Sequence, residues 1–88
     1  MAKKIKMFMM STCPYCKQAF CMMEELKQKY SAYQEIEMEV IDENKEPAKT
    51  DGYEYWYVPT FFVDDKKIHE GVPTMEKIQA VFEAAVVE

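Results

Sequence analysis

The chain has 88 residues, of which 49% are hydrophobic, and its formal net charge is −5 at pH 7. A chain of this length folds around one core, so we expect a single domain over residues 1–88 and a monomer. The excess of 16 acidic over 11 basic residues argues against nucleic acid or an anionic membrane as the main partner. The apolar run after Lys6 ends after four residues, too short for a signal peptide or a membrane span, so we expect a cytoplasmic protein.

The first third of the chain predicts a strand followed by an amphipathic helix. Residues 3–10 are rich in apolar side chains and include Ile5 and Phe8, which favour a buried central strand. Pro14 suits the first helical turn, where a missing N–H costs nothing. A helix is predicted over 14–30, because apolar side chains recur there at steps of three or four residues. They are Phe20, Met23, Leu26 and Tyr30.

The middle of the chain predicts a second strand and then a polar connection. Apolar and charged residues alternate strictly over 35–40, which indicates a strand with Ile36, Met38 and Val40 on its buried face. The polar segment 43–51 leaves room for a short helix only.

The last third predicts a β-hairpin and a final helix. We expect strands over 60–64 and 67–70, joined by a turn at 64–66. Thr74 is a favourable N-cap residue for a helix that would end the chain. The apolar face of that helix is predicted to consist of Met75, Ile78, Phe82, Ala85 and Val86.

The order of these elements predicts an α/β fold. It runs strand, helix, strand, short helix, strand, strand, helix. A strand, a helix and a second strand imply a parallel right-handed crossover, and the closing hairpin adds antiparallel strands. The sequence therefore predicts a mixed four-stranded sheet flanked by helices.

Two cysteines stand where the first strand ends and the helix begins. The free N–H groups and the partial positive charge of a helix start would favour the thiolate of Cys13, which is the form that attacks a disulfide. Cys16 follows one helical turn later, where it would resolve the mixed disulfide. This spacing indicates a catalytic dithiol with Cys13 as the nucleophile and Cys16 as the resolving thiol.

The chain resembles the glutaredoxin branch of the thioredoxin superfamily. The resemblance is carried by Cys13-Pro14-Tyr15-Cys16 and by Val58-Pro59-Thr60 ahead of an apolar strand. It implies a thioredoxin fold over nearly the whole chain and thiol–disulfide oxidoreductase activity on protein or mixed disulfides, in cell redox homeostasis. It also implies a cis peptide bond before Pro59, with the Val58 backbone pairing with the substrate. Thr12 and Tyr15 would shape the rim of the site.

The electron donor stays open between glutathione and a flavoprotein reductase of the thioredoxin-reductase type. Glutaredoxins typically carry a lysine three residues before the first cysteine, where this chain has Met10. Their segment for the γ-glutamyl carboxylate corresponds here to residues 70–74, in which Pro73 has no N–H to donate. We expect no bound cofactor and no metal, and disulfide-containing proteins as substrates.

A metal-binding module that uses Cys13, Cys16 and Cys21 is the alternative of another class. A zinc site would need a fourth ligand, and His69 is the single histidine of the chain. We expect His69 to be an exposed strand residue instead. Cys21 lies among apolar neighbours and is predicted to be a small buried hydrophobic residue. The aromatic segment 53–57 is expected to contribute partly to the core and partly to a rim around the dithiol.

Overall fold

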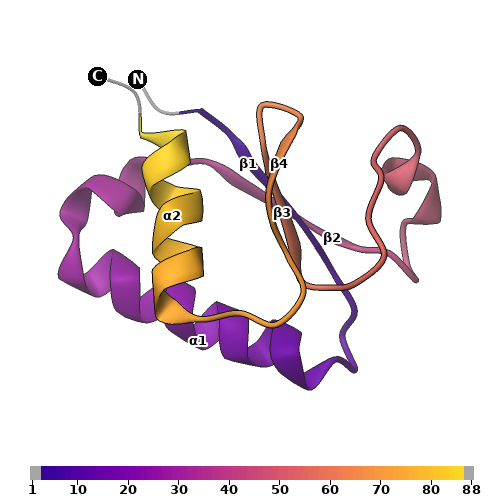
Figure 1. Ribbon diagram of the computed structural model, residues 1–88, viewed down its shortest axis with the longest axis horizontal. Coiled ribbons are helices and arrows are strands. Elements are labelled where there is room, and N and C mark those ends of the chain that lie inside the picture. Colours follow the sequence, from indigo (N-terminus) through magenta and orange to yellow (C-terminus); the bar gives the residue numbers. More distant parts are fainter. Residues whose placement is uncertain (1–2, 87–88) are drawn as a thin grey trace.

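The computed structural model describes residues 3–86 and contains two helices, four strands and two short 3₁₀ turns (Figure 1). Their order is β1 (Ile5–Met9), α1 (Pro14–Lys29), η1 (Ser31–Glu35), β2 (Met38–Asp42), η2 (Pro47–Thr50), β3 (Thr60–Val63), β4 (Lys66–Glu70) and α2 (Met75–Ala85). The first two and last two residues of the expected domain lie outside the described residues.

The strands form one mixed sheet in the order β2-β1-β3-β4. The central strand β1 runs parallel to β2 and antiparallel to β3, and β3 and β4 form an antiparallel hairpin. This topology confirms the predicted α/β fold, including the parallel crossover through α1. It places the ends of β1 and β2 next to the start of β3, at the edge of the sheet where α1 begins.

Both helices cover the same face of the sheet and enclose the larger core. Ile5 and Met7 of β1 point to this face, as do Phe61 and Val63 of β3. The helices, η1 and the residue that follows η1 contribute the remaining buried side chains, which are Ala19, Met23, Leu26, Tyr33, Ile36, Ile78, Val81, Phe82 and Ala85. In Figure 1, α2 and the segment around η2 lie on opposite sides of the strands.

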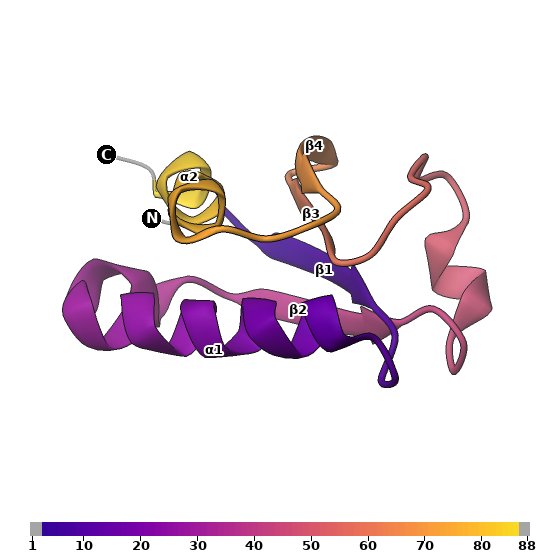
Figure 2. The same ribbon diagram turned by 60° about the horizontal axis from the view of Figure 1, so that its bottom comes forward.

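The opposite face of the sheet is covered by the connection between β2 and β3. Buried Phe8, Ile41 and Phe62 face this connection, and Tyr53, Tyr55 and Val58 pack against them. The rings of Phe8 and Tyr55 stack at a centroid distance of 4.9 Å. The expected short helix is the 3₁₀ turn η2, which lies in this connection (Figure 2). The aromatic side chains of Tyr53 and Tyr55, and not a longer helix, cover this face of the sheet.

The second strand begins later than the sequence predicts. Residues 31–35 form the 3₁₀ turn η1, which buries Tyr33 against the ring of Phe82, and β2 starts at Met38 and extends to Asp42. The alternation placed Val40 on the correct face, but Val40 is 43% exposed. Since β2 is an edge strand, α1 does not reach far enough to cover it.

The hairpin and the final helix follow the predicted chemistry. Asp64 and Asp65 form the turn with φ angles of 48° and 66°, which is the conformation that matches the twist of a two-residue hairpin. Thr74 caps α2, because its Oγ1 accepts a hydrogen bond from the Lys77 N–H at 3.2 Å. The prediction of Val86 on the buried face is wrong. Val86 lies beyond the last turn of α2 and is exposed.

Neither α1 nor α2, nor any other helix within residues 3–86, has the length and apolar character that crossing a membrane requires.

Candidate active site

The dithiol lies at the start of α1, as predicted. Cys13 is the N-cap residue with extended backbone angles, and Pro14 takes the first helical position. The Cys13 N–H donates to the Met10 carbonyl at 3.1 Å, which closes the turn between β1 and α1. The loop after the central strand therefore presents Cys13 at the helix terminus, where partial positive charge favours an anion.

The two thiols differ in their access to solvent. Cys13 is half-buried, whereas Cys16 is only 1% exposed, and both are free thiols. Burial raises the pKa of Cys16 to about 12, and the neighbouring Cys13 thiol contributes to the same shift through a hydrogen bond. Cys16 is therefore a thiol at neutral pH, and Cys13 is the sulfur that an incoming disulfide can reach.

Val58 and Pro59, which we call the proline loop, lie just before β3 and face Cys13. The bond between Val58 and Pro59 is cis, which confirms what the family resemblance implied. The Cys13 thiol donates to the Val58 carbonyl at an Sγ–O distance of 3.8 Å. The Pro59 carbonyl in turn accepts the Gly71 N–H at 3.0 Å, so the loop is tied to the end of β4. The structure thus brings Cys13, Val58 and Pro59 together.

A small apolar groove opens beside the proline loop. It has a volume of about 290 Å³ and is lined by Tyr15, Tyr57, Val58, Gly71 and Val72. Tyr15 is 46% exposed, and Tyr57 and Val72 are more exposed still. The predicted position of Tyr15 on a rim agrees with this geometry. Thr12 is exposed, and its part in the rim stays a prediction.

The aromatic segment 53–57 divides between the two environments that the sequence suggested. Tyr53 and Tyr55 are half-buried and pack on Phe8, on the face of the sheet opposite the helices. Trp56 is 89% exposed and Tyr57 is 70% exposed. The exposed pair therefore lies at the surface immediately before Val58, next to the groove.

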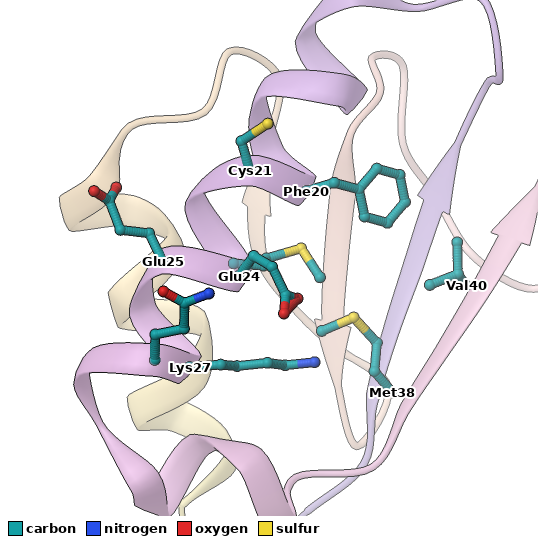
Figure 3. Close-up of a pocket in the computed structure, with 9 residues that line it drawn as sticks. Phe20, Cys21, Glu24, Glu25, Lys27, Met38 and Val40 are labelled. Atoms are coloured by element: carbon teal, nitrogen blue, oxygen red, sulfur yellow. The ribbon is translucent and has the colours of Figure 1, made fainter.

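The prediction of a buried Cys21 is wrong. Cys21 is exposed, because the buried positions of α1 are Cys16, Ala19, Met23 and Leu26, and Cys21 falls outside that stripe. Its apolar neighbours in the sequence suggested burial, but the helical phase places it on another side. Figure 3 shows Cys21 on α1 beside an open groove of about 830 Å³ that α1 forms with the edge strand β2.

His69 is buried, not exposed as the sequence suggested. Its ring packs against Phe61, and its Nε2 lies 3.2 Å from the Gly71 carbonyl oxygen. Burial lowers the pKa of His69 from its ordinary value. Among residues 3–86, no group of three or more His, Cys, Asp or Glu side chains is arranged to hold a metal ion. The hypothesis of a metal-binding module thus gains no support from the arrangement of its cysteines.

Glu70, at the end of β4, is a site residue that the sequence analysis did not single out. Its carboxylate accepts the N–H groups of Trp56 and Tyr57 and pairs with Lys67. These contacts, with that of Lys67 foremost, lower the pKa of Glu70 to about 2. No local sequence signal marks such a residue, because its partners lie 13 and 14 positions away in the chain.

The arrangement defines a class of protein. A Cys-x-x-Cys pair at the start of α1, which faces a cis-proline ahead of an antiparallel strand, is the arrangement of thioredoxin-fold redox proteins. The family model described as a thioredoxin domain matches residues 3–83, and the chain belongs to that family. Membership of this family indicates a function in thiol–disulfide redox chemistry.

Solved structures share this fold at low sequence identity. A structure described as that of a malarial protein aligns with a TM-score of 0.70 and 15% identity, over 96% of this chain and 97% of that one. Thioredoxin 1 from the thermophilic eubacterium Thermosipho africanus aligns with a TM-score of 0.61 and 21% identity, over 92% of each chain. No curated protein sequence matches the chain at a significant level.

Proposed function

We propose that this protein is a thiol–disulfide oxidoreductase that reduces protein or mixed disulfides through Cys13 and Cys16. The observation that carries the proposal is the asymmetry of the dithiol. The accessible Cys13 thiol faces the Val58 carbonyl, while Cys16 is fully buried one turn further along α1. This asymmetry supports Cys13 as the sulfur that attacks the substrate and Cys16 as the sulfur that resolves the mixed disulfide.

The reaction proceeds by two exchanges at sulfur. The Cys13 thiolate attacks one sulfur of the substrate disulfide, forms a mixed disulfide and releases the other substrate sulfur as a thiolate, which takes up a proton. Cys16 then loses its proton and attacks Cys13 Sγ. This second exchange forms the Cys13–Cys16 disulfide and releases the second substrate thiol. Two electrons pass to the substrate, and an external donor returns them.

The burial of Cys16 gives the order of these steps a physical reason. A thiol with a pKa of about 12 carries little thiolate at neutral pH, so it does not compete for the incoming disulfide. Once the mixed disulfide has formed on Cys13, both sulfurs lie within one helical turn, and the second exchange becomes intramolecular. The backbone of Val58 would hold the substrate beside Cys13 in the manner of an added strand.

The start of α2 favours a flavoprotein reductase over glutathione as the electron donor. Pro73 is buried just before Thr74, the N-cap of this helix, and has no N–H to offer a carboxylate. N–H groups of the first helical turn have no partner within the helix, but here that of Lys77 already donates to Thr74 Oγ1. Met10 provides no positive charge beside the dithiol. A thioredoxin-like reductant served by a reductase is therefore our preferred form of the proposal.

Reduction of insulin tests both levels of the proposal. The assay compares glutathione with its reductase against NADPH with thioredoxin reductase as the source of electrons. We expect turnover with the second system and loss of turnover in Cys13→Ser. In Cys16→Ser, the covalent complex between Cys13 and the substrate should accumulate and be visible on a non-reducing gel. Cys21→Ser is the matched control and should retain full activity, because Cys21 lies outside the site.

Three results would contradict the proposal or its parts. Full insulin reduction by Cys13→Ser would exclude the dithiol mechanism. Equal activity of Cys16→Ser and the unchanged protein would show that Cys16 resolves nothing. Turnover with glutathione alone would reverse the preference for a flavoprotein reductase and leave the dithiol chemistry intact.

A further inference from the structure

Two side chains of β4, Lys67 and Glu70, tie down the segment that leads to the proline loop. One oxygen of Glu70 accepts the N–H groups of both Trp56 and Tyr57, the latter at 2.9 Å. Its other oxygen pairs with Lys67 Nζ at 2.7 Å. Lys67 Nζ also donates to the Glu54 carbonyl at 3.2 Å. Together, Glu70 and Lys67 hold three backbone groups within residues 54–57.

The side chains of Trp56 and Tyr57 contribute little to their own anchoring. They are 89% and 70% exposed, so few packing contacts restrain this part of the chain. The Tyr57 carbonyl accepts a hydrogen bond from the buried Thr60 hydroxyl, and its N–H is held by Glu70. Polar contacts to the backbone, centred on Glu70, therefore fix the direction of the main chain as it reaches Val58.

The part of the loop that faces the dithiol begins directly after Tyr57. The next residue is Val58, whose carbonyl oxygen lies 3.8 Å from Cys13 Sγ. Tyr57 and Val58 also line the apolar groove of about 290 Å³, and Gly71, the neighbour of Glu70, lines the same groove. A displacement of Tyr57 would thus change both the wall of the groove and the backbone that meets a substrate chain.

We infer that Glu70 is a positioning residue that prepares the groove for a polypeptide disulfide. The inference rests on the proposed function. By holding the amides of Trp56 and Tyr57, Glu70 keeps the Val58 backbone and the Tyr57 side chain in place before the substrate arrives. A disulfide within an extended polypeptide needs this surface, whereas a small aromatic disulfide needs access to Cys13 alone. Glu70 therefore acts on substrate class and not on the chemistry of sulfur.

The charge on Glu70 strengthens the anchor. A carboxylate that accepts two amide N–H groups and one ammonium forms stronger hydrogen bonds than a neutral acceptor does. These same contacts keep Glu70 ionised at every pH at which the protein is expected to work. The amide side chain of Gln keeps the length and one acceptor oxygen, Asp keeps the charge but is shorter, and Ala removes both.

Kinetics with two substrates tests the inference. Insulin is the polypeptide disulfide and is assayed at steady state with dithiothreitol as the reductant. The small disulfide is 5,5′-dithiobis(2-nitrobenzoic acid), which dithiothreitol reduces directly, so it is mixed in single-turnover reactions with protein that has been reduced and freed of dithiothreitol, in a Cys21→Ser background that removes the other exposed thiol. For Glu70→Ala we expect KM for insulin to rise about tenfold, with kcat and the rate with the small disulfide unchanged. Glu70→Asp should raise this KM less, and Glu70→Gln should lie closest to the unchanged protein, because the Gln oxygen still reaches both amides, whereas the shorter Asp side chain loses this reach despite its charge. Glu46→Ala, which removes a surface ion pair with Lys49, is the control.

The fluorescence of Trp56 gives a second measurement, which does not depend on enzymatic activity. Trp56 is the single tryptophan of the chain, so its fluorescence anisotropy reports the motion of this segment. We expect anisotropy to fall in Glu70→Ala and to be unchanged in Glu46→Ala. A residue with a merely structural role would alter thermal stability without separating the two substrates.

The outcomes separate this inference from the proposed function. If the unchanged protein reduces neither disulfide, the proposed function fails. If it reduces both, and Glu70→Ala matches Glu46→Ala in insulin KM and in anisotropy, the positioning role is refuted. An equal loss of activity toward both substrates would refute it as well. If Glu70→Ala does not fold, the comparison between Glu70→Asp and Glu70→Gln tests the role instead. An insulin KM for Glu70→Gln as high as that for Glu70→Asp would then refute it.

Discussion

The difference between the two site cysteines leads to a quantitative prediction about alkylation. In a Cys13→Ser variant, Cys16 and exposed Cys21 are the remaining thiols. We expect iodoacetamide at pH 7 to modify Cys16 more than tenfold and up to about 100-fold more slowly than an ordinary exposed thiol. The physical reason is the burial of Cys16, which disfavours its thiolate.

The magnitude is set by the pKa of Cys16. In the unchanged protein the pKa of Cys16 is about 12, which leaves about 10⁻⁵ of Cys16 as thiolate at pH 7. Burial is the largest cause of this shift and persists in Cys13→Ser, whereas the smaller contribution of Cys13 is lost there. An ordinary thiol with a pKa of about 8.5 is about 3% thiolate, which is roughly 3,000-fold more. A more basic thiolate is also more nucleophilic. With a Brønsted coefficient of about 0.4–0.5, the Cys16 thiolate reacts roughly 40-fold faster than an ordinary thiolate, which offsets part of its scarcity. A net factor of about 100 follows from the full pKa shift. In Cys13→Ser the loss of the Cys13 contribution lowers this factor, and the 1% exposure of Cys16 raises it.

Mass spectrometry of tryptic peptides measures the two rates separately. Trypsin places position 16 in the peptide 7–17 and position 21 in the peptide 18–27, because Lys6, Lys17 and Lys27 flank them. The same reaction in 6 M guanidinium chloride is the control, and there the two rates should become similar. Alkylation of Cys16 within tenfold of Cys21 in the folded protein would refute the argument from burial.

Three further predictions concern stability. Phe8→Ala should lower the free energy of unfolding by about 3–5 kcal/mol in guanidinium titrations, because Phe8 is fully buried and carries the packing on its face of the sheet; a loss below about 1 kcal/mol would contradict this. Thr74→Ala should cost about 1 kcal/mol in the same assay, because the Lys77 N–H loses its cap, and no change would show that water replaces the cap without loss. Glu70 has a folded pKa of about 2, below its ordinary value of 4.5, so its contribution to stability is present above pH 4.5 and is lost as the pH falls toward 2. Between pH 5 and pH 2 the free energy of unfolding should therefore decrease more steeply for the unchanged protein than for Glu70→Gln. Parallel curves would contradict this contribution of Glu70.

Local patterns in the sequence were sufficient for the order of elements and for the dithiol. Helix α1 spans Pro14–Lys29 against a predicted 14–30, because the spacing of apolar residues and the position of Pro14 are local properties. The cis bond at Pro59 came from the resemblance between motifs, since a local argument favours trans. The predicted roles of Thr12 and of the Val58 backbone stay predictions.

Burial was harder to predict than secondary structure. Alternation assigned Val40 to the correct face, but it is exposed because β2 is at the edge of the sheet. Cys21 was predicted from its neighbours in sequence, whereas the angular position around α1 decides its exposure. His69 is polar and was expected at the surface, yet a ring contact with Phe61 and a carbonyl partner make its burial tolerable.

The sequence by itself determined the order of the helices and strands, the place of Cys13 and Cys16 at the start of a helix, and a proline ahead of β3. These features depend on neighbours within one or two turns, and such short-range preferences are written in the order of the residues. The tertiary structure alone decided which cysteine is reachable and what holds the loop in front of it. Glu70 meets Trp56 and Tyr57 only because the hairpin and the proline loop fold side by side. Contacts of that kind depend on how the elements pack together, and no local pattern encodes them.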